Sequence, residues 1–215
     1  MLALIDMDLA DVDTDGIFDG ITGAGPWDSD DWKPATQVNG GAPDGLAHQL
    51  NLTSGDNLGA ITLTVTGTDA DGNVITEAIT GPAATTVEST KFFKTVTGLA
   101  ASSTLGANTL DVGWVDEAVS PTIKLDWRRN VPSNYFLNVD GTINVDVDHA
   151  VENVEAVTDQ HSINWINVSS SLLAETADSA AFVQIAAGYT AFRMNVNSYS
   201  SGARARLYVS QPEKP

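Results

Sequence analysis

The sequence predicts an all-β protein with an antiparallel β-sandwich or jelly-roll-like architecture, and three observations lead to this class. Polar and apolar residues alternate at 61–66, 142–148, 192–197 and 203–209, which is the two-residue period of a half-buried strand. Turn-forming Gly, Asn, Asp and Pro residues separate these runs, and no long stretch keeps the helical period. Small and β-branched residues dominate the composition, as in sandwiches of many short strands.

The clearest strand pattern lies at residues 61–79. Ile61, Leu63 and Val65 alternate with threonines, and a second run begins near Asn73. The intervening segment DADGN contains residue types that tolerate the left-handed backbone of a tight reversal. This stretch therefore predicts an antiparallel hairpin.

We expect three parts along the chain: an extended acidic arm at 1–45, a first β-sandwich unit at 46–118 and a second β-sandwich unit at 119–215. The expected strands lie near residues 48–52, 58–66, 73–80, 92–97, 108–115, 123–127, 134–138, 142–148, 163–168, 192–197 and 203–209. The two β units are either separate sandwiches or parts of one larger body, and the sequence leaves both open.

The expected arm combines strong negative charge with large apolar side chains. Residues 1–31 contain nine aspartates and neither lysine nor arginine, yet Phe18, Trp27 and Trp32 are too apolar for a solvated linker. An arm that docks these aromatic side chains on another subunit accounts for both features. An arm that packs on its own domain accounts for them equally well.

The net charge of −18 excludes several classes of partner. Nucleic-acid binding depends on Lys and Arg, and the chain has 10 of these against 28 acidic residues. The same charge disfavours an anionic membrane surface, and no apolar run of 18 residues is present. The chain has no cysteine, which removes disulfides and thiolate ligands. Its N-terminal residues lack the pattern of a signal peptide, so we expect synthesis in a cytoplasm.

Arginines are few, and two groups of them are candidate contact residues. The C-terminal pattern predicts a hairpin with one apolar face, and its other face would bring Arg193, Arg204 and Arg206 together as a basic patch. Arg128 and Arg129 follow a tryptophan in an expected loop. In an acidic protein that self-associates, such arginines would pair with aspartates of a neighbouring copy. We therefore expect a homo-oligomer.

The one motif that suggests a metal is an aspartate triplet in the arm. Asp11, Asp13 and Asp15 precede Gly16 with the spacing that begins a calcium loop. The twelfth position is Thr22, where a bidentate glutamate is expected. We accordingly predict no metal site and no cofactor.

No constellation recommends an enzyme. His48, His149 and His161 are far apart in sequence, and the chain contains no GxSxG nucleophile motif, no HExxH zinc motif and no P-loop. A Ser-His-Asp set would be easy to assemble by chance in a chain rich in serine and aspartate. We predict that the protein is not an enzyme.

A resemblance to a known group rests on the hairpin region. The segment LTVTGTDADGNVITEAITGP, followed by TKFFKTVTGL, is similar to the shared middle of a group of tailed-bacteriophage virion structural proteins. This resemblance implies a β-rich particle component, either a head decoration or a neck or tail part, located in the virion. It implies binding to capsid, neck or tail subunits through the β units and the arm. The alternative is a receptor- or carbohydrate-binding module of a tail fibre or spike.

Overall fold

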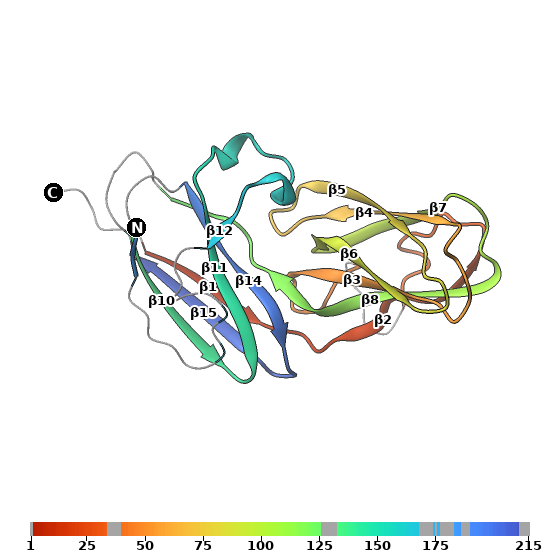
Figure 1. Cartoon of the computed structure of the whole chain (residues 1–215), viewed down its shortest axis with the longest axis horizontal. Helices are drawn as coiled ribbons and strands as arrows, with labels where there is room; N and C mark the ends of the chain where they lie inside the picture. The colour runs from red at the N-terminus through yellow and green to blue at the C-terminus, as the bar shows by residue number, and fades with distance from the viewer. Residues whose placement is uncertain are drawn as a thin grey trace. The chain divides into compact units, whose positions relative to one another are not determined.

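The computed structural model describes residues 2–33, 40–125, 133–167, 174, 176, 183–185 and 190–210, and it confirms the all-β prediction. The described residues form antiparallel strands and two short 3₁₀ turns, Val154–Ala156 and Gln160–Ser162, and none of them lies in an α-helix (Figure 1). Within this part of the chain no helix is long and apolar enough to cross a membrane.

The chain divides into two compact units. Residues 12–116 form one of them, which we call the continuous unit. Residues 1–11 and 117–215 form the other, which we call the discontinuous unit because its two pieces are far apart in sequence. Strand β8 (Gly106–Val119) runs through the boundary, so that its last three residues belong to the discontinuous unit.

The continuous unit has two sheets. In one, β8 lies between β2 (Asp13–Gly23) and β3 (Ala47–Thr53), and β3 also pairs with β6 (Thr86–Phe93). The other has the order β5 (Val74–Thr80), β4 (Thr62–Thr68) and β7 (Thr95–Ala101). The buried side chains of this unit include Phe18, Leu50, Leu52, Leu63, Val65, Phe93, Leu99, Leu110 and Trp114.

The predicted hairpin at residues 61–79 is confirmed. Strands β4 and β5 pair without a register shift, from Thr62 opposite Thr80 to Thr68 opposite Val74. The buried Asp69 carboxylate accepts bonds from the backbone N–H groups of Asp71 and Asn73, both at 2.9 Å. The predicted turn residues therefore form the turn, because the aspartate side chain satisfies backbone donors within it.

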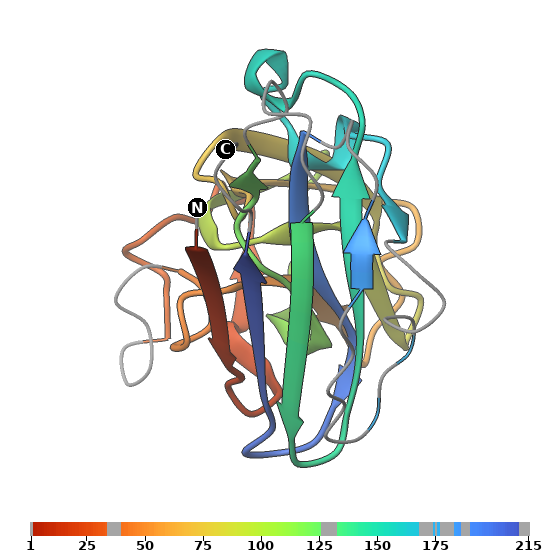
Figure 2. The same ribbon diagram turned by 90° about the vertical axis from the view of Figure 1, so that its left-hand side faces the viewer.

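The strands of the discontinuous unit lie in two sheets, and one of these is the sheet that contains β8. The sheet without β8 has the order β1 (Leu2–Asp8), β15 (Arg204–Ser210), β10 (Ser133–Asp140) and β13 (Val183–Ile185), and Figure 2 shows these strands side by side. The other has the order β12 (Ile166–Asn167), β11 (Ile143–Ala150) and β14 (Ala191–Tyr199). The end of β8 and β9 (Ile123–Lys124) also pair with β14. Buried side chains of this unit include Ile5, Met7, Tyr135, Leu137, Val145, Val147, Phe192, Met194, Val196 and Leu207.

The predicted C-terminal hairpin is wrong as a hairpin, although both of its strands exist. Strand β14 pairs with β11 in one sheet, whereas β15 pairs with β1 and β10 in the other. The turn at Ser200–Gly202 therefore carries the chain from one sheet to the other, and the turn at Gly141 does the same between β10 and β11. The pairs β10–β15 and β11–β14 are thus successive segments of one ribbon that folds over itself. The apolar alternation of β14 and β15 serves this arrangement because each strand turns its apolar side into the same core.

The expected extended arm is replaced by strands. Residues 2–8 form β1 of the discontinuous unit, and residues 13–23 form β2 of the continuous unit. Of the two alternatives, packing on its own chain is the one that the structure has. Alternating Ile5 and Met7 point into a core while Asp6 and Asp8 stay at the surface, so the aspartates do not prevent strand formation.

Candidate functional site

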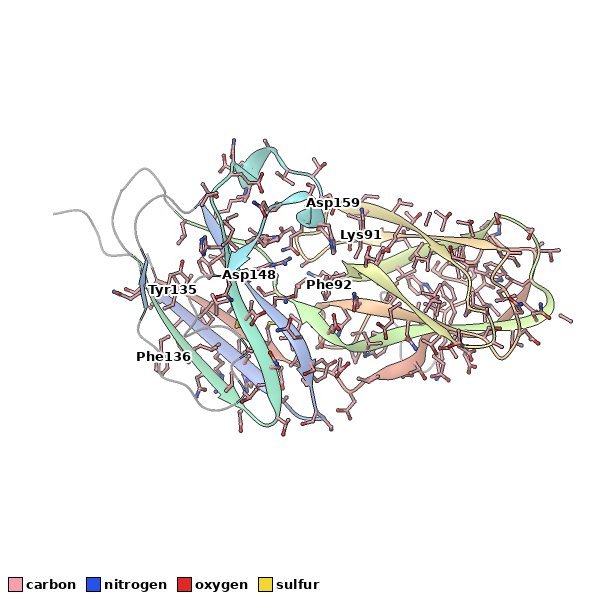
Figure 3. All side chains as sticks on the ribbon, viewed as in Figure 1. Lys91, Phe92, Tyr135, Phe136, Asp148 and Asp159 are labelled. Atoms are coloured by element: carbon pink, nitrogen blue, oxygen red, sulfur yellow. The ribbon has the colours of Figure 1, made fainter. Side chains whose placement is uncertain are left out.

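The outer face of the β1–β15–β10 sheet gathers exposed apolar and charged side chains, and we call it the β1–β15–β10 face. Its outward residues alternate with the core residues of each strand. They are Leu2, Leu4, Asp6 and Asp8 on β1, Arg204, Arg206, Tyr208 and Ser210 on β15, and Asn134, Phe136, Asn138 and Asp140 on β10. On β10 the neighbours Tyr135 and Phe136 point to opposite sides, and Figure 3 labels both.

Three of these residues form an apolar row across the strands. Leu4 lies opposite Tyr208, and Tyr208 lies opposite Phe136. The rings of Phe136 and Tyr208 are in contact, with centroids 5.9 Å apart. Leu2 is 78% exposed, Leu4 52% and Tyr208 38%, so apolar surface that would gain from burial faces solvent here.

Ion pairs occupy the neighbouring positions of the same face. The Asp6 carboxylate accepts a bond from Arg204 Nε at 2.7 Å, and Arg206 Nε lies 3.5 Å from the same carboxylate. The hydrogen bond from Arg204 is the main cause that lowers the pKa of Asp6, and the same bond raises the pKa of Arg204. Two of the predicted contact arginines therefore lie on this face, with their charge partly balanced.

Arg193 lies elsewhere, so the predicted patch of three arginines does not exist. Its Nε is 3.4 Å from Asp148 Oδ2, and its guanidinium carbon lies 4.5 Å from the centre of the Trp165 ring. Arg193 is on β14, whereas Arg204 and Arg206 are on β15 of the other sheet. Burial raises the pKa of Asp148 despite the nearby guanidinium. Figure 3 labels Asp148 on β11.

The aromatic residues of the expected arm belong to the continuous unit. Phe18 is fully buried on β2 opposite Val112. Trp27 is 5% exposed, donates its indole N–H to the Thr22 carbonyl at 3.3 Å and forms a backbone bridge with Leu99. Phe18 and Trp27 were predicted as contact residues for another subunit, but their own unit buries both side chains.

The remaining predicted contact residues are less informative. Trp32 is half-buried, and a side chain at Gly40 would collide with its ring. Arg128 and Arg129 lie outside the described residues.

The aspartates of the calcium-like triplet interact with a lysine. Asp15 Oδ1 is 2.7 Å from Lys33 Nζ, and this bond is the main cause that lowers the pKa of Asp15. Partial burial is the main cause that raises the pKa of Asp13. The described residues contain no group of three or more His, Asp or Glu side chains arranged to hold a metal ion.

The three histidines lie on separate elements. His48 on β3 is buried, and its Nε2 is 2.8 Å from Asp44 Oδ2. His149 on β11 is buried, and this burial lowers its pKa to about 4. His161 lies in a 3₁₀ turn whose cap is the Asp159 side chain.

Sequence reasoning missed the apolar members of the β1–β15–β10 face. The segment Leu2-Ala3-Leu4-Ile5 is apolar at every position, so the period of two is invisible in it. That uniform apolarity is itself a signal, because a strand that is apolar on both sides needs a cover on both sides. No protein-family model and no curated protein matches this chain.

Proposed function

We propose that this protein is a non-enzymatic structural component of a tailed-phage virion and that it binds neighbouring particle subunits through its β units. The observation that carries the proposal is the β1–β15–β10 face, which places an apolar row beside ion-paired arginines. The resemblance of residues 61–99 to virion structural proteins supports the same function. Binding without chemistry is the mechanism that this proposal implies.

The chemistry of this face matches that of protein contact surfaces. Tyrosine and arginine are enriched at the centres of interfaces, where they supply area and directed hydrogen bonds. Tyr208 and Leu4 would lose solvent contact on binding, while Arg204 and Arg206 would remain near the rim and fix the orientation of the partner. The affinity of each contact would be multiplied by the symmetry of a particle.

The decisive experiment locates the protein in intact virions. Antibodies against the purified chain should label one region of the particle, and quantitative mass spectrometry should give a copy number that fits the symmetry of that region. Absence of the chain from purified virions, in an infection that produces it, would contradict the proposal.

The second candidate is a receptor- or carbohydrate-binding module, and one surface favours it. Asn144 and Asp146 on β11 lie beside Asn195 and Asn197 on β14, and Trp165 is near this strip. Carboxamides, carboxylates and aromatic rings are common partners of sugars. Here the groups already bind one another, since Asn197 Nδ2 donates to Asn144 Oδ1 at 3.1 Å and to Asp146 Oδ2 at 2.9 Å.

The positions of the tryptophan rings weaken the case for a carbohydrate-binding module. Trp27 and Trp114 are buried, and Arg193 covers one face of Trp165. Binding to a glycan array, lost in Trp165→Ala and retained in Trp32→Ala, would favour the receptor function over the structural one. Antibodies that block adsorption to host cells would point in the same direction.

A further inference from the structure

Strand β1 is an open edge of its sheet. It pairs with β15 over all seven of its residues, from Leu2 opposite Ser210 to Asp8 opposite Arg204, with no bulge. On its other side no strand of the described chain pairs with it. Such an edge presents backbone N–H and C=O groups to any further strand.

Three other outer strands of the described sheets are irregular or covered. Strand β2 shifts register three times along β8, which disrupts a regular edge. The outer strand β6 is bridged to β5, because the Glu77 carboxylate accepts bonds from the N–H groups of Thr90 at 2.8 Å and Lys91 at 2.9 Å. Trp27 pairs with Leu99 of β7. Strand β1 pairs with β15 without a register shift. Its inward residues Ala3, Ile5 and Met7 include no charged residue and no proline.

The side chains of β1 divide it into an apolar half and an acidic half. Leu2 and Leu4 are exposed in the first half, and Asp6 and Asp8 occupy the second. In a chain with a net charge of −18, the apolar half is a place where a second copy can approach without bringing carboxylates together. The apolar row from Phe136 through Tyr208 ends at Leu4, at the open edge itself.

We propose that two copies of this chain associate by antiparallel pairing of β1 with β1 of the second copy, about a two-fold axis at Leu4. Leu4 then lies opposite Leu4 of the partner, and the apolar row continues from one sheet into the other. This pairing gives the expected homo-oligomer a defined contact surface, strand β1. It does not depend on whether the chain belongs to a virion.

The choice of register follows from length and charge. An axis at Leu4 pairs residues 2–6 and leaves no two carboxylates opposite or diagonal to each other. An axis at Ile5 would pair all of β1 but would set Asp6 diagonal to Asp6 of the partner, at about 7 Å. An axis at Ala3 would pair only residues 2–4. In the chosen register Leu2 faces Asp6, whose charge Arg204 and Arg206 already offset.

A contact of this size predicts reversible association. Stable interfaces bury more than about 1,000 Å² in total, and five paired residues with a short apolar row approach only the lower end of this class. We therefore expect a dimer that forms with rising concentration, as an isologous contact that closes on itself. Sedimentation of the full chain over a wide concentration range should detect it.

The absence of cysteine makes single-cysteine crosslinking a direct test. Under mild oxidation Leu4→Cys should form a disulfide-linked dimer, because opposite residues of an antiparallel pair have Cα atoms about 4.5–5.5 Å apart. Asp8→Cys is the matched control on the same face of the same strand, because the position opposite to it in this register lies outside β1. Equal crosslinking of the two variants, or none in either, would overturn the proposal.

A second pair of variants tests the same contact without oxidation. Leu4→Lys places two ammonium groups at the axis and should abolish the dimer while circular dichroism stays unchanged, since Leu4 is 52% exposed. Val74→Lys on β5 is the control, because Val74 is 74% exposed on another edge strand. Continued association of Leu4→Lys, or a wild-type chain that is monomeric at every concentration, would refute the inference. A dimer that is absent from virions would leave it standing and would contradict only the proposed function.

Discussion

The two units of this protein are both antiparallel β structures, but they close in different ways. Every strand of the continuous unit comes from residues 12–116, and its β4–β5 hairpin joins neighbours through a five-residue turn. The discontinuous unit is closed by the chain ends, since residues 2–8 pair with residues 204–210. One unit is therefore formed by a single segment of the chain, whereas the other is closed by a contact between two segments far apart in sequence.

The acidic N-terminal segment supplies strand β1 to the discontinuous unit and strand β2 to the continuous unit. These two strands differ in regularity. Strand β2 is bulged, and Lys33 holds Asp15 beside it at 2.7 Å. Strand β1 is regular and open on one side. Net charge therefore does not decide how a strand is used. The burial of alternate residues and the available neighbours decide it.

Removal of residues 1–9 should have the largest effect and should act on one unit. Ile5, Met7 and Leu9 are buried, and loss of each removes about 1.5–3 kcal/mol of apolar burial. The sum approaches the whole stability of a typical domain. We expect calorimetry to show loss of the transition of the discontinuous unit, while that of the continuous unit remains.

A peptide of residues 1–9 added in trans serves as the control for this truncation. It should restore the lost transition if β1 is needed only as a strand. A single unchanged transition in the truncated chain would contradict the division into two units.

The substitution Gly113→Ala should come next, and it should act on the other unit. A Cβ atom at this position would lie 1.9 Å from the backbone oxygen of Asp13, where neither strand can yield easily. Overpacking of this kind typically costs about 1–3 kcal/mol. Chemical denaturation should therefore show a loss confined to the continuous unit. Gly55→Ala is the control, because a Cβ there meets no atom within 4 Å.

A smaller effect should appear in the way the stability of the discontinuous unit depends on pH. Burial lowers the pKa of His149 to about 4, below its usual value of 6.5. Between these values the unfolded chain binds a proton at His149 that the folded chain does not, so stability should fall as the pH drops from 6.5 towards 4. By about pH 5.5, one unit below the usual pKa, the loss should be about 1.4 kcal/mol.

Comparison of the wild type with His149→Leu at each pH isolates this contribution. The raised pKa of Asp148 acts in the opposite sense and is common to both proteins. Parallel pH profiles of the two proteins would show that His149 does not cause the dependence.

The smallest effect should come from Asp6→Asn at the β1–β15–β10 face. The lowered pKa of Asp6 gives a contribution that is present above about pH 4 and is lost as the pH falls through the pKa of the folded state. Because the pair with Arg204 is exposed, we expect the melting temperature of the discontinuous unit to fall by only about 1–2 °C. High salt should remove the difference between the two proteins, and persistence of the difference in salt would argue against an ion-pair origin.

Much of the local structure could be predicted from the sequence. Alternation at 142–148 predicts β11, and alternation at 192–197 and 203–209 predicts β14 and β15. The turn residues at Asp69–Asn73 predict the β4–β5 reversal. These features are local because side-chain alternation and turn geometry depend on a few consecutive residues.

The candidate site could be predicted only in part. Arg204 and Arg206 were expected as contact residues, and they lie on the β1–β15–β10 face. Leu4, Tyr208 and Phe136 were not, since they become neighbours only when the start, the middle and the end of the chain pair in one sheet. Phe18 and Trp27 were misplaced because exposed and buried aromatics look alike in a segment without a clear period.

The β class, the positions of most strands and the apolar side of those strands that alternate can be predicted from the sequence alone. The β4–β5 pairing can be predicted as well, but most other pairings are visible only in the folded structure. The turn at Asp69–Asn73 keeps β4 and β5 in one sheet, whereas the turn at Ser200–Gly202 sends β14 and β15 into different sheets. The physical reason is that alternation fixes the orientation of a side chain relative to its own strand, while pairing depends on which backbone edges and apolar faces meet in the folded core.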